Sequence, residues 1–511
     1  MDAIWCVLGV SLGCASLLYP FGRDQGLYYY VAREWMLRGS IPYRDVLDHK
    51  TPGIYLLYAL GVRLFGEVMW PIRVFDLVCV AMLGFFAARV ATRRGEPTRP
   101  GLVGASIFFL SVLYYGHLDY WNTAQSELWY SMLGMGAVWA ALHVRRAGLG
   151  QFVTGAFAGA ALLMKPPAMW LVVVALGVLL RDVLATREAR WKRIAIGAVR
   201  VGAGAMLVPV PVLAYFASKA AIGPMLDIVV GANNYYVTHE VGIRSPLEVF
   251  VKIAEYSWVY LPMFVGLALA LIAQRPRGDA AKRDELRLVL FMLLAGLLAV
   301  WMQKKFYLLH WTVLLGPLTA TFALALRWAL DARRPSSLKV HAACLASVVV
   351  LHWGSTFTAG GFGMWRAGAE AALKRYRGQS TALEFGAAFA SPAVGFWFDH
   401  SQRVGDYLRE HTSADDFVAV RGFQPEIYAV AQRRHGGRFF WTTFLVNPAR
   451  AYRRAEWLAE DLQALEARPP KYVVALTEIK EGPDSPGYFL PLGYAVEVVM
   501  GEFTLLRRRG Q

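Results

Sequence analysis

Apolar stretches long enough to cross a lipid bilayer recur through most of this 511-residue chain and constrain its fold more than any other feature. The hydrocarbon core of a bilayer is about 30 Å thick, so a spanning helix needs about 20 mostly apolar residues. The composition agrees, because 56% of the residues are hydrophobic and only 18% are charged. The sequence therefore predicts an α-helical polytopic membrane protein with about eleven spans. They are expected at residues 3–19, 71–90, 101–115, 126–145, 152–164, 167–180, 194–217, 257–273, 286–302, 306–327 and 340–357.

The basic residues gather in alternate short connections between these spans. A formal net charge of +16 could suggest a nucleic-acid partner, but a binding face for nucleic acid would not follow the spans in this way. The groups lie at residues 89–99, 145–146, 181–193, 275–287 and 327–339. The positive-inside rule places all of them in the cytoplasm, and no nucleic acid is expected. With these loops inside, the N-terminus is also expected in the cytoplasm. The first span has no Lys or Arg before it, so we expect a retained helix rather than a cleaved signal.

The long apolar stretches end at Phe357, and shorter helix and strand patterns follow. VGDYLREHTSADDFVAV reads as a helix followed by a strand, QPEIYAVAQRR as another helix, and KYVVAL and YAVEVVM as strands. We therefore expect a transmembrane domain over residues 1–360 and a soluble C-terminal α/β domain over residues 361–511. With eleven spans and a cytoplasmic N-terminus, this domain is expected on the extracytoplasmic side of the membrane. The loop after the first span is expected on the same side.

That loop, GRDQGLYYYVAREWMLRGSIPYRDVLDHKTPG, is unusually polar for its surroundings. Residues 25–38 have helical spacing and Gly39 is a plausible stop, which predicts a short helix lying in the membrane interface. Its aromatic residues, Tyr28, Tyr29, Tyr30 and Trp35, suit the headgroup region. Asp24 falls just before the first turn. It could be a helix N-cap, a catalytic carboxylate facing the outer leaflet, or both together.

The second half of the loop cannot be regular structure, because Pro42 and Pro52 each remove a backbone donor and restrict the residue before them. It brings together three cations and two aspartates, which could be either site residues or solvated charges: Arg44, His49, Lys50, Asp45 and Asp48. Residues 53–66 are apolar but too short to span comfortably, so we expect a helix along the outer interface.

These residues resemble the polytopic GT-C glycosyltransferases, in particular the group of aminoarabinose, lipid A galacturonosyl and protein O-mannosyl transferases. The resemblance rests on an outward Asp before a tyrosine-rich helix, on Tyr-Arg-Asp, and on a carboxylate shortly before Lys-x-Pro. Two later stretches agree with it, LLMKPPAMW and KKFYLLHWTVLLGPL.

The resemblance implies a sugar donor carried on a polyprenyl phosphate. Aspartates are ionised at neutral pH, and Asp24 is the candidate base that deprotonates the acceptor hydroxyl. Asp48 would orient the acceptor or hold a cation. The leaving phosphate needs only cations to stabilise its charge, and the candidates are Lys50, Lys165, Lys304 and Lys305, although lysines beside a membrane also snorkel to headgroups. One carboxylate acting as base predicts inversion at the anomeric carbon.

The other candidate residues are weaker. Candidate substrate contacts are Arg44, His49, Tyr307, His310 and Glu127, and the last could instead cap its helix. Asp24, Asp48, His49 and His310 are candidate ligands of a divalent cation, although their spacing matches no metal motif. ANNYYVTHE, in the outer loop at residues 218–256, could cover the substrates or form an ordinary amphipathic lid.

Two other classes of function remain open. A lipid or sugar transporter would place ionisable residues in mid-membrane and show repeated halves, whereas the polar groups here gather at one face. A non-catalytic anchor for the α/β domain would not need the cluster from Asp24 to Lys50. The leading expectation is an enzyme of the cytoplasmic membrane with an extracytoplasmic site. Its partners would be the lipid-linked donor, membrane lipids, and an acceptor glycan, lipid or protein.

Overall fold

The computed structural model describes residues 2–144, 146–185, 189–239, 279–330, 336–356 and 361–510, together with residues 247, 248, 251 and 268. The chain forms two compact units. The first, here called the helical unit, comprises Met1–Leu17, Arg73–Leu213 and Ile243–Ala367. The second, the mixed unit, comprises Leu18–Ile72, Ala214–Gly242 and Gly368–Gln511. The opening loop and the C-terminal segment therefore belong to one unit, although most of the chain separates them in sequence.

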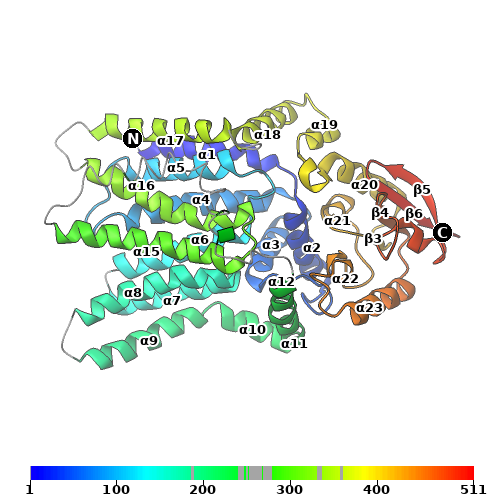
Figure 1. Cartoon of the computed structure of the whole chain (residues 1–511), viewed down its shortest axis with the longest axis horizontal. Coiled ribbons are helices and arrows are strands. Elements are labelled where there is room, and N and C mark those ends of the chain that lie inside the picture. Colours follow the sequence, from blue (N-terminus) through cyan, green and yellow to red (C-terminus); the bar gives the residue numbers. More distant parts are fainter. Residues whose placement is uncertain are drawn as a thin grey trace. The chain divides into compact units, whose positions relative to one another are not determined.

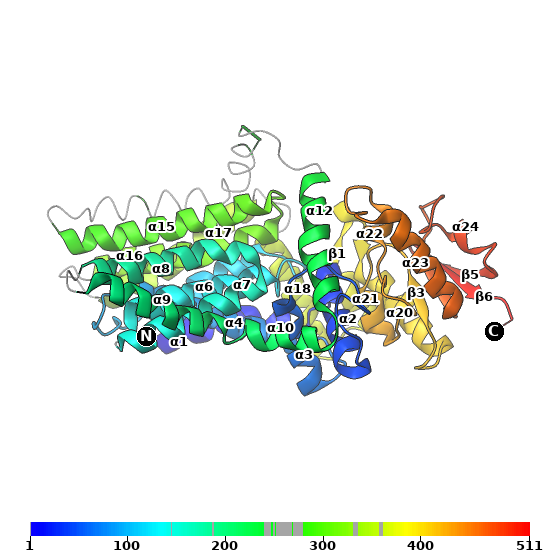
Figure 2. The ribbon, with the colours of Figure 1, turned by 90° about the horizontal axis from the view of Figure 1, so that it is seen from below.

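Long helices run side by side in the helical unit (Figure 1 and Figure 2). The helices described in this unit, long and short, are α1 (Asp2–Cys14), η1 (Ala15–Leu18), α4 (Trp70–Val90), α5 (Leu102–His117), α6 (Ser126–His143), α7 (Ala147–Met164), η2 (Pro166–Ala168), α8 (Met169–Leu184), α9 (Arg190–Met206), α10 (Pro209–Ser218), α15 (Ala280–Gln303), η5 (Leu308–Leu314), α16 (Leu315–Leu330), α17 (Ser336–Thr356) and α18 (Gly361–Tyr376). The ends of η1, α4, α10 and α18 extend into the other unit's share of the sequence.

The multi-pass membrane character is supported by the length and composition of these helices. Within the described residues, five helices are long and apolar enough to cross a membrane, or up to seven if each bent pair is one span. Helices cover the expected spans wherever the chain is described, with ends that differ by a few residues. The expected span at 257–273 lies outside the described residues, as do Arg145, Arg187, Arg275, Arg277, Arg333 and Arg334 of the basic groups. The count of eleven therefore stays a prediction.

Small residues explain the close packing of α7 on α9. A Cβ added at Gly155 or at Gly159 would lie 2.0 Å from a backbone oxygen of α9, that of Val201 or of Ala205. Gly204 of α9 has the same relation to the backbone of Phe152. Small residues spaced four apart let two membrane helices bring their backbones together, and van der Waals packing then replaces the hydrophobic effect as the driving force.

The mixed unit combines short helices with a small sheet. Its helices are α2 (Arg23–Arg38), α3 (Pro52–Phe65), α11 (Ile222–Leu226), η3 (Asp227–Ala232), α12 (Asn233–His239), α19 (Ala382–Ala387), η6 (Pro392–Val394), α20 (Phe398–His411), α21 (Glu426–Ala431), α22 (Thr443–Val446), α23 (Arg454–Ala467) and α24 (Pro486–Phe489). Its strands are β1 (Ala390–Ser391), β2 (Phe396–Trp397), β3 (Val418–Val420), β4 (Tyr472–Leu476), β5 (Tyr494–Met500) and β6 (Phe503–Arg508).

The sheet confirms the strands expected in the C-terminal segment and adds another. Its order is β3-β4-β6-β5, with β3 parallel to β4 and the other pairs antiparallel (Figure 1). Strand β6 was not anticipated, and it follows β5 through a turn in which Gly501 has a φ of 58°. A residue with positive φ favours the tight hairpin turns that join antiparallel strands, so this glycine was the available signal. The apolar side of the sheet packs through Val473, Leu506 and Phe489.

Candidate active site

Helix α2 carries Asp24 in its first turn. The helix begins at Arg23, its N-cap is Gly22, and the cap residue makes no side-chain hydrogen bond. The expectation that Asp24 precedes the helix as an N-cap is therefore wrong. A carboxylate in the first turn is still favoured by the positive end of the helix dipole. The C-terminal end is as expected, because Gly39 adopts a φ of 71° and its N–H bonds to the carbonyl of Glu34.

The aromatic side chains of α2 are buried inside the mixed unit rather than free for a headgroup layer. Tyr28, Tyr29 and Tyr30 are each at most 3% exposed. Tyr30 stacks on Phe440 with ring centroids 4.2 Å apart, and Trp35 donates a 2.6 Å hydrogen bond to the hydroxyl of Tyr215. The expected interfacial role of these rings is wrong, because residues distant in sequence supply an apolar environment for them and partners for their polar atoms.

Helix α2 is held against the C-terminal part of the mixed unit by backbone contacts. A Cβ added at Gly26 would lie 2.6 Å from the backbone nitrogen of Glu426, the first residue of α21. The guanidinium of Arg33 donates to the carbonyl of Arg433 at 2.8 Å, and the N–H of His435 donates to the hydroxyl of Tyr30 at the same distance. The helix that carries Asp24 is thus placed by residues about 400 positions away.

We expect Gly26→Ala to lower both stability and any activity that depends on Asp24. Local propensity alone favours Ala over Gly inside a helix by about 1 kcal/mol. The new methyl group, however, meets a backbone that cannot turn aside, and overpacking of this kind costs about 1–3 kcal/mol. The measurement is a pair of melting curves with turnover rates. Gly223→Ala is the matched control, because a Cβ at Gly223 of α11 meets no atom within 4 Å. Equal melting and turnover in the two variants would contradict the contact.

The loop between α2 and α3 has a defined shape, as the two prolines predicted. Tyr43 has a φ of 71°, and its N–H bonds to the carbonyl of Val46 at 2.8 Å. Arg44 forms an ion pair with Asp45 and also donates to the carbonyl of Lys219 at 2.7 Å. Burial raises the pKa of Asp45, but the hydrogen bonds from Arg44 and from the backbone N–H of Ile41, together with the charge of Arg44, outweigh it, so the net shift of this pKa is downward. Arg44 therefore already has an anionic partner within the loop.

Asp48 is the buried centre of this loop. Its side chain is fully buried; one oxygen accepts from the Tyr55 hydroxyl at 2.7 Å, and the other from the backbone N–H of His49 at 2.7 Å. The imidazole Nδ1 of His49 lies 2.9 Å from that second oxygen. Burial raises the pKa of Asp48, but the His49 bond, the nearby charge of Lys50 and the Tyr55 bond outweigh it, so the pKa lies below its usual range. A buried carboxylate with both oxygens engaged is suited to fixing its neighbours in place.

His49 connects this loop to α12 and to the C-terminal segment. Its carbonyl accepts a 2.7 Å hydrogen bond from the amide of Asn233, and its ring lies 5.9 Å from that of Tyr236. The guanidinium of Arg450 lies over the Tyr236 ring at 4.5 Å. Burial, followed by the charge of Lys50, lowers the pKa of His49. The ANNYYVTHE segment could cover the substrates or form an ordinary amphipathic lid, and its described part contacts the candidate site residue His49.

Lys50 carries its positive charge close to the buried carboxylate of Asp48, without forming an ion pair with it. Its ammonium lies 6.0 Å from the centroid of the Tyr28 ring, and among the described residues no carboxylate forms an ion pair with it. Backbone atoms fix its place, because the Lys50 carbonyl accepts from Tyr43 and its N–H donates to Tyr55. A cation held on a rigid loop can bind an anionic group without first breaking an ion pair.

The helical unit contains a second polar cluster, around Glu127 at the start of α6. The Glu127 side chain is fully buried and forms a short ion pair with Lys165, which follows α7. The same ammonium donates to Gln303 at 2.7 Å, and the imidazole of His310 lies 4.0 Å from Glu127. Sequence reasoning selected Glu127, Lys165 and His310 separately. It did not predict that they meet, and it missed Gln303, for which the chain offers no local signal.

The remaining candidates follow α15. Lys304 ends this helix in the left-handed conformation, with a φ of 57°, and is exposed. Lys305 is partly buried, and Tyr307 is 43% exposed with its ring 5.3 Å from that of His310. Of the candidate metal ligands, Asp24, Asp48 and His49 belong to the mixed unit and His310 to the helical unit. Within the described ranges, no group of three or more His, Cys, Asp and Glu side chains is placed to hold a metal ion.

Comparisons with known proteins bear on the membrane part and on the fold. The family model described as dolichyl-phosphate-mannose-protein mannosyltransferase matches residues 49–215, a range that includes Lys50, Glu127 and Lys165. No curated protein matches the chain in sequence. The structure of ArnT from Cupriavidus metallidurans bound to undecaprenyl phosphate has a TM-score of 0.62 and 14% identity, over 99% of this chain and 97% of that one. Its apo structure has a TM-score of 0.58 and 15% identity over the same shares.

The likeness to ArnT extends over nearly the full length of both chains, so this chain has the ArnT fold, C-terminal segment included. The family model, which is independent of the structure, selects the segment that begins at His49. Together they confirm the resemblance to the GT-C membrane glycosyltransferases.

Proposed function

We propose that this chain transfers a sugar from a polyprenyl phosphate to a hydroxyl group on the extracytoplasmic face of the cytoplasmic membrane. The observation that carries the proposal is the likeness, over 99% of the chain, to a protein solved with undecaprenyl phosphate bound. The loop chemistry supports it. A carboxylate in the first turn of α2 and a lysine on the following loop are the two groups that this reaction requires.

In the proposed reaction the acceptor oxygen attacks the anomeric carbon as the bond from that carbon to the phosphate oxygen breaks. Asp24 takes the proton of the acceptor hydroxyl. The bonding electrons leave with the polyprenyl phosphate, whose developing negative charge is stabilised by Lys50. No glycosyl-enzyme intermediate forms, so the anomeric configuration inverts. Asp48 is assigned a positioning role, because its two oxygens already hold His49 and Tyr55.

The proposal is tested by transfer from a polyprenyl-phosphate sugar, with the protein in nanodiscs and candidate acceptors added. Mass spectrometry of the envelope glycolipids and glycoproteins of a deletion strain would identify the acceptor by one missing sugar increment. We expect transfer with inversion. A protein that binds the polyprenyl phosphate and moves it between leaflets without cleaving the sugar would instead be a transporter. A protein that binds no such lipid would be an anchor for the C-terminal segment.

Lys50→Ala is expected to raise the donor concentration needed for half-maximal rate by about 10- to 100-fold, because a charge-assisted hydrogen bond contributes about 1.5–3 kcal/mol. The variant also loses the contact of the ammonium with Tyr28, about 1 kcal/mol, and the charge beside Asp48, which keeps its hydrogen bonds from His49 and Tyr55. We therefore expect a smaller effect on the melting temperature than on donor affinity. Lys50→Arg should recover part of the donor affinity. Lys219→Ala is the control, because it removes an exposed lysine from the same unit. Unchanged donor dependence in Lys50→Ala would remove Lys50 from the phosphate site.

A further inference from the structure

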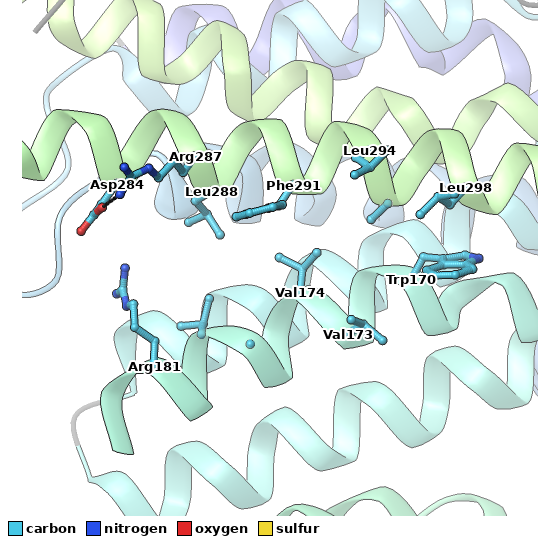
Figure 3. A pocket seen from close by; sticks show the side chains of 13 residues that line it. Trp170, Val173, Val174, Arg181, Asp284, Arg287, Leu288, Phe291, Leu294 and Leu298 are labelled. Carbon is cyan, nitrogen blue, oxygen red and sulfur yellow. Dashed lines mark hydrogen bonds and ion pairs between the residues drawn. The ribbon is translucent and has the colours of Figure 1, made fainter. Parts of the chain in front are cut away.

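A groove between α8 and α15 belongs to neither cluster described above. It is an open groove with a volume of about 480 Å³ within the helical unit. Figure 3 shows the two helices facing each other across it, with Trp170 toward one end and Arg181, Asp284 and Arg287 at the other. The groove is therefore apolar along its length and charged at one end only.

Several apolar side chains that line the groove are exposed on the surface of the helical unit. Val173 and Leu294 are 52% and 50% exposed, and Phe291 is 59% exposed. Gly177 lies four residues after Val173 on α8, and a Cβ added at Gly177 would meet no atom within 4 Å. In a helix that crosses a bilayer, exposed apolar side chains of this kind contact acyl chains. The open space at Gly177 makes the groove deeper at this point, which leaves room for one acyl chain.

The length of the groove fits one leaflet. Trp170 and Arg181 are eleven residues apart on α8, which at a rise of 1.5 Å per residue corresponds to about 16 Å. One leaflet contributes about 15 Å of hydrocarbon, half of the bilayer core. An acyl chain that runs from Trp170 along Gly177 would therefore bring its headgroup to the level of the two arginines.

The charged end can bind a phosphate. Arg287 forms a 3.0 Å ion pair with Asp284, and Arg181 lies 3.7 Å from Asp182 on its own helix. These arginine side chains are 67% and 59% exposed, and exposed ion pairs contribute only about 0–1 kcal/mol, so both guanidiniums are available at little cost. A guanidinium matches two phosphate oxygens at once. Lys282 and Arg283, near Arg287 on α15, add two further cations, beside the carboxylates of Asp284 and Glu285.

We propose that this groove is a binding site for an anionic glycerophospholipid of the leaflet that faces the basic loops. One acyl chain lies along Val173, Gly177 and Phe291, and the phosphate sits between Arg181 and Arg287. The occupant is identified by charge complementarity, because basic pockets between membrane helices select anionic headgroups and zwitterionic lipids gain less from two arginines. The site is separate from the donor phosphate cations assigned above.

The test is native mass spectrometry of the full chain released from nanodiscs and titrated with phosphatidylglycerol or phosphatidylcholine. We expect tighter binding of phosphatidylglycerol. Arg181→Gln/Arg287→Gln should weaken its affinity by about 30-fold, since each basic residue near the surface contributes about one kcal/mol. The control, Arg190→Gln/Arg193→Gln, removes two exposed arginines from α9 and should change affinity little.

A second variant tests the acyl channel without altering charge. Gly177→Leu fills the open space on α8 and should displace the lipid, whereas Gly202→Leu places the same side chain where α9 also has open space and should not. Equal binding of the two phospholipids would overturn the proposal. So would loss of affinity in the α9 controls, retention of the lipid in Gly177→Leu, or a polyprenyl phosphate as the lipid that the two arginines retain.

Discussion

Replacing Asp24 with asparagine is expected to reduce sugar transfer by about 100- to 10,000-fold, the usual cost of losing a general base. Asparagine keeps the size of the side chain and its ability to accept a hydrogen bond, but it cannot take a proton from an acceptor hydroxyl. The carboxylate lies in the first turn of α2, so losing its charge should cost only about 0.3–1 kcal/mol of stability through the helix dipole. The measurement is turnover with a polyprenyl-phosphate sugar in nanodiscs, beside a melting curve of the same preparation.

The control for Asp24→Asn is Asp415→Asn, which makes the same chemical change at an exposed residue of the mixed unit. It should keep both turnover and melting temperature. Near-normal turnover in Asp24→Asn would contradict the base assignment and direct attention to Asp48. That residue is a poor substitute, because its oxygens are occupied by Tyr55 and His49. A large loss of turnover accompanied by a large fall in melting temperature would mean that Asp24 supports the folding of α2 rather than the chemical step.

The second large effect is expected at Lys165. Lys165→Met leaves Glu127 fully buried without its cation, and breaking a buried ion pair from one side costs about 3–5 kcal/mol. We therefore expect a strong drop in thermal stability in detergent. Lys304→Met is the matched control, because it removes an exposed lysine of the same unit and should be nearly neutral. A Lys165→Met protein as stable as this control would mean that Glu127 does not depend on Lys165.

The double variant Glu127→Gln/Lys165→Met separates the two roles open to Lys165. Removing both charges should restore most of the stability, because no buried carboxylate is left alone. The contacts with Glu127 and Gln303 already use the ammonium, so we expect the donor concentration for half-maximal rate to stay close to that of the unaltered protein. Restored stability together with a 10-fold or larger weakening would instead support the phosphate role that the sequence suggested for Lys165.

If both Asp24→Asn and Lys50→Ala behave as expected, the mixed unit holds the base and one phosphate cation on a single folded body. The contacts of Gly26 and Arg33 with the C-terminal segment give that segment a function of its own. It fixes the helix that carries the base, and a small misplacement of a reacting group can cost about 100-fold in rate. Gly26→Ala tests this link without changing any polar group of the site.

Local patterns in the sequence were sufficient for several elements. The apolar stretches predicted helices, and helices cover the expected spans wherever the chain is described. The end of α2 at Gly39, the irregular loop between Pro42 and Pro52, and strands β4 and β5 also followed from short-range signals. These features depend on backbone preferences and on the spacing of apolar residues. Both can be read from short stretches of sequence, without knowing which distant segments pack together.

Tertiary structure alone decided which side chains meet. Amphipathic spacing could not distinguish a headgroup layer from a protein interior, so the tyrosines of α2 were assigned to lipid although Phe440 and His435 surround Tyr30. Lys165 looked like a cation for a substrate, and it is paired with Glu127 from another helix. In each case the partner lies far away in sequence. The sequence pattern around a residue indicates whether its side chain can be buried. The partner that stabilises the buried side chain is supplied only when distant segments pack together.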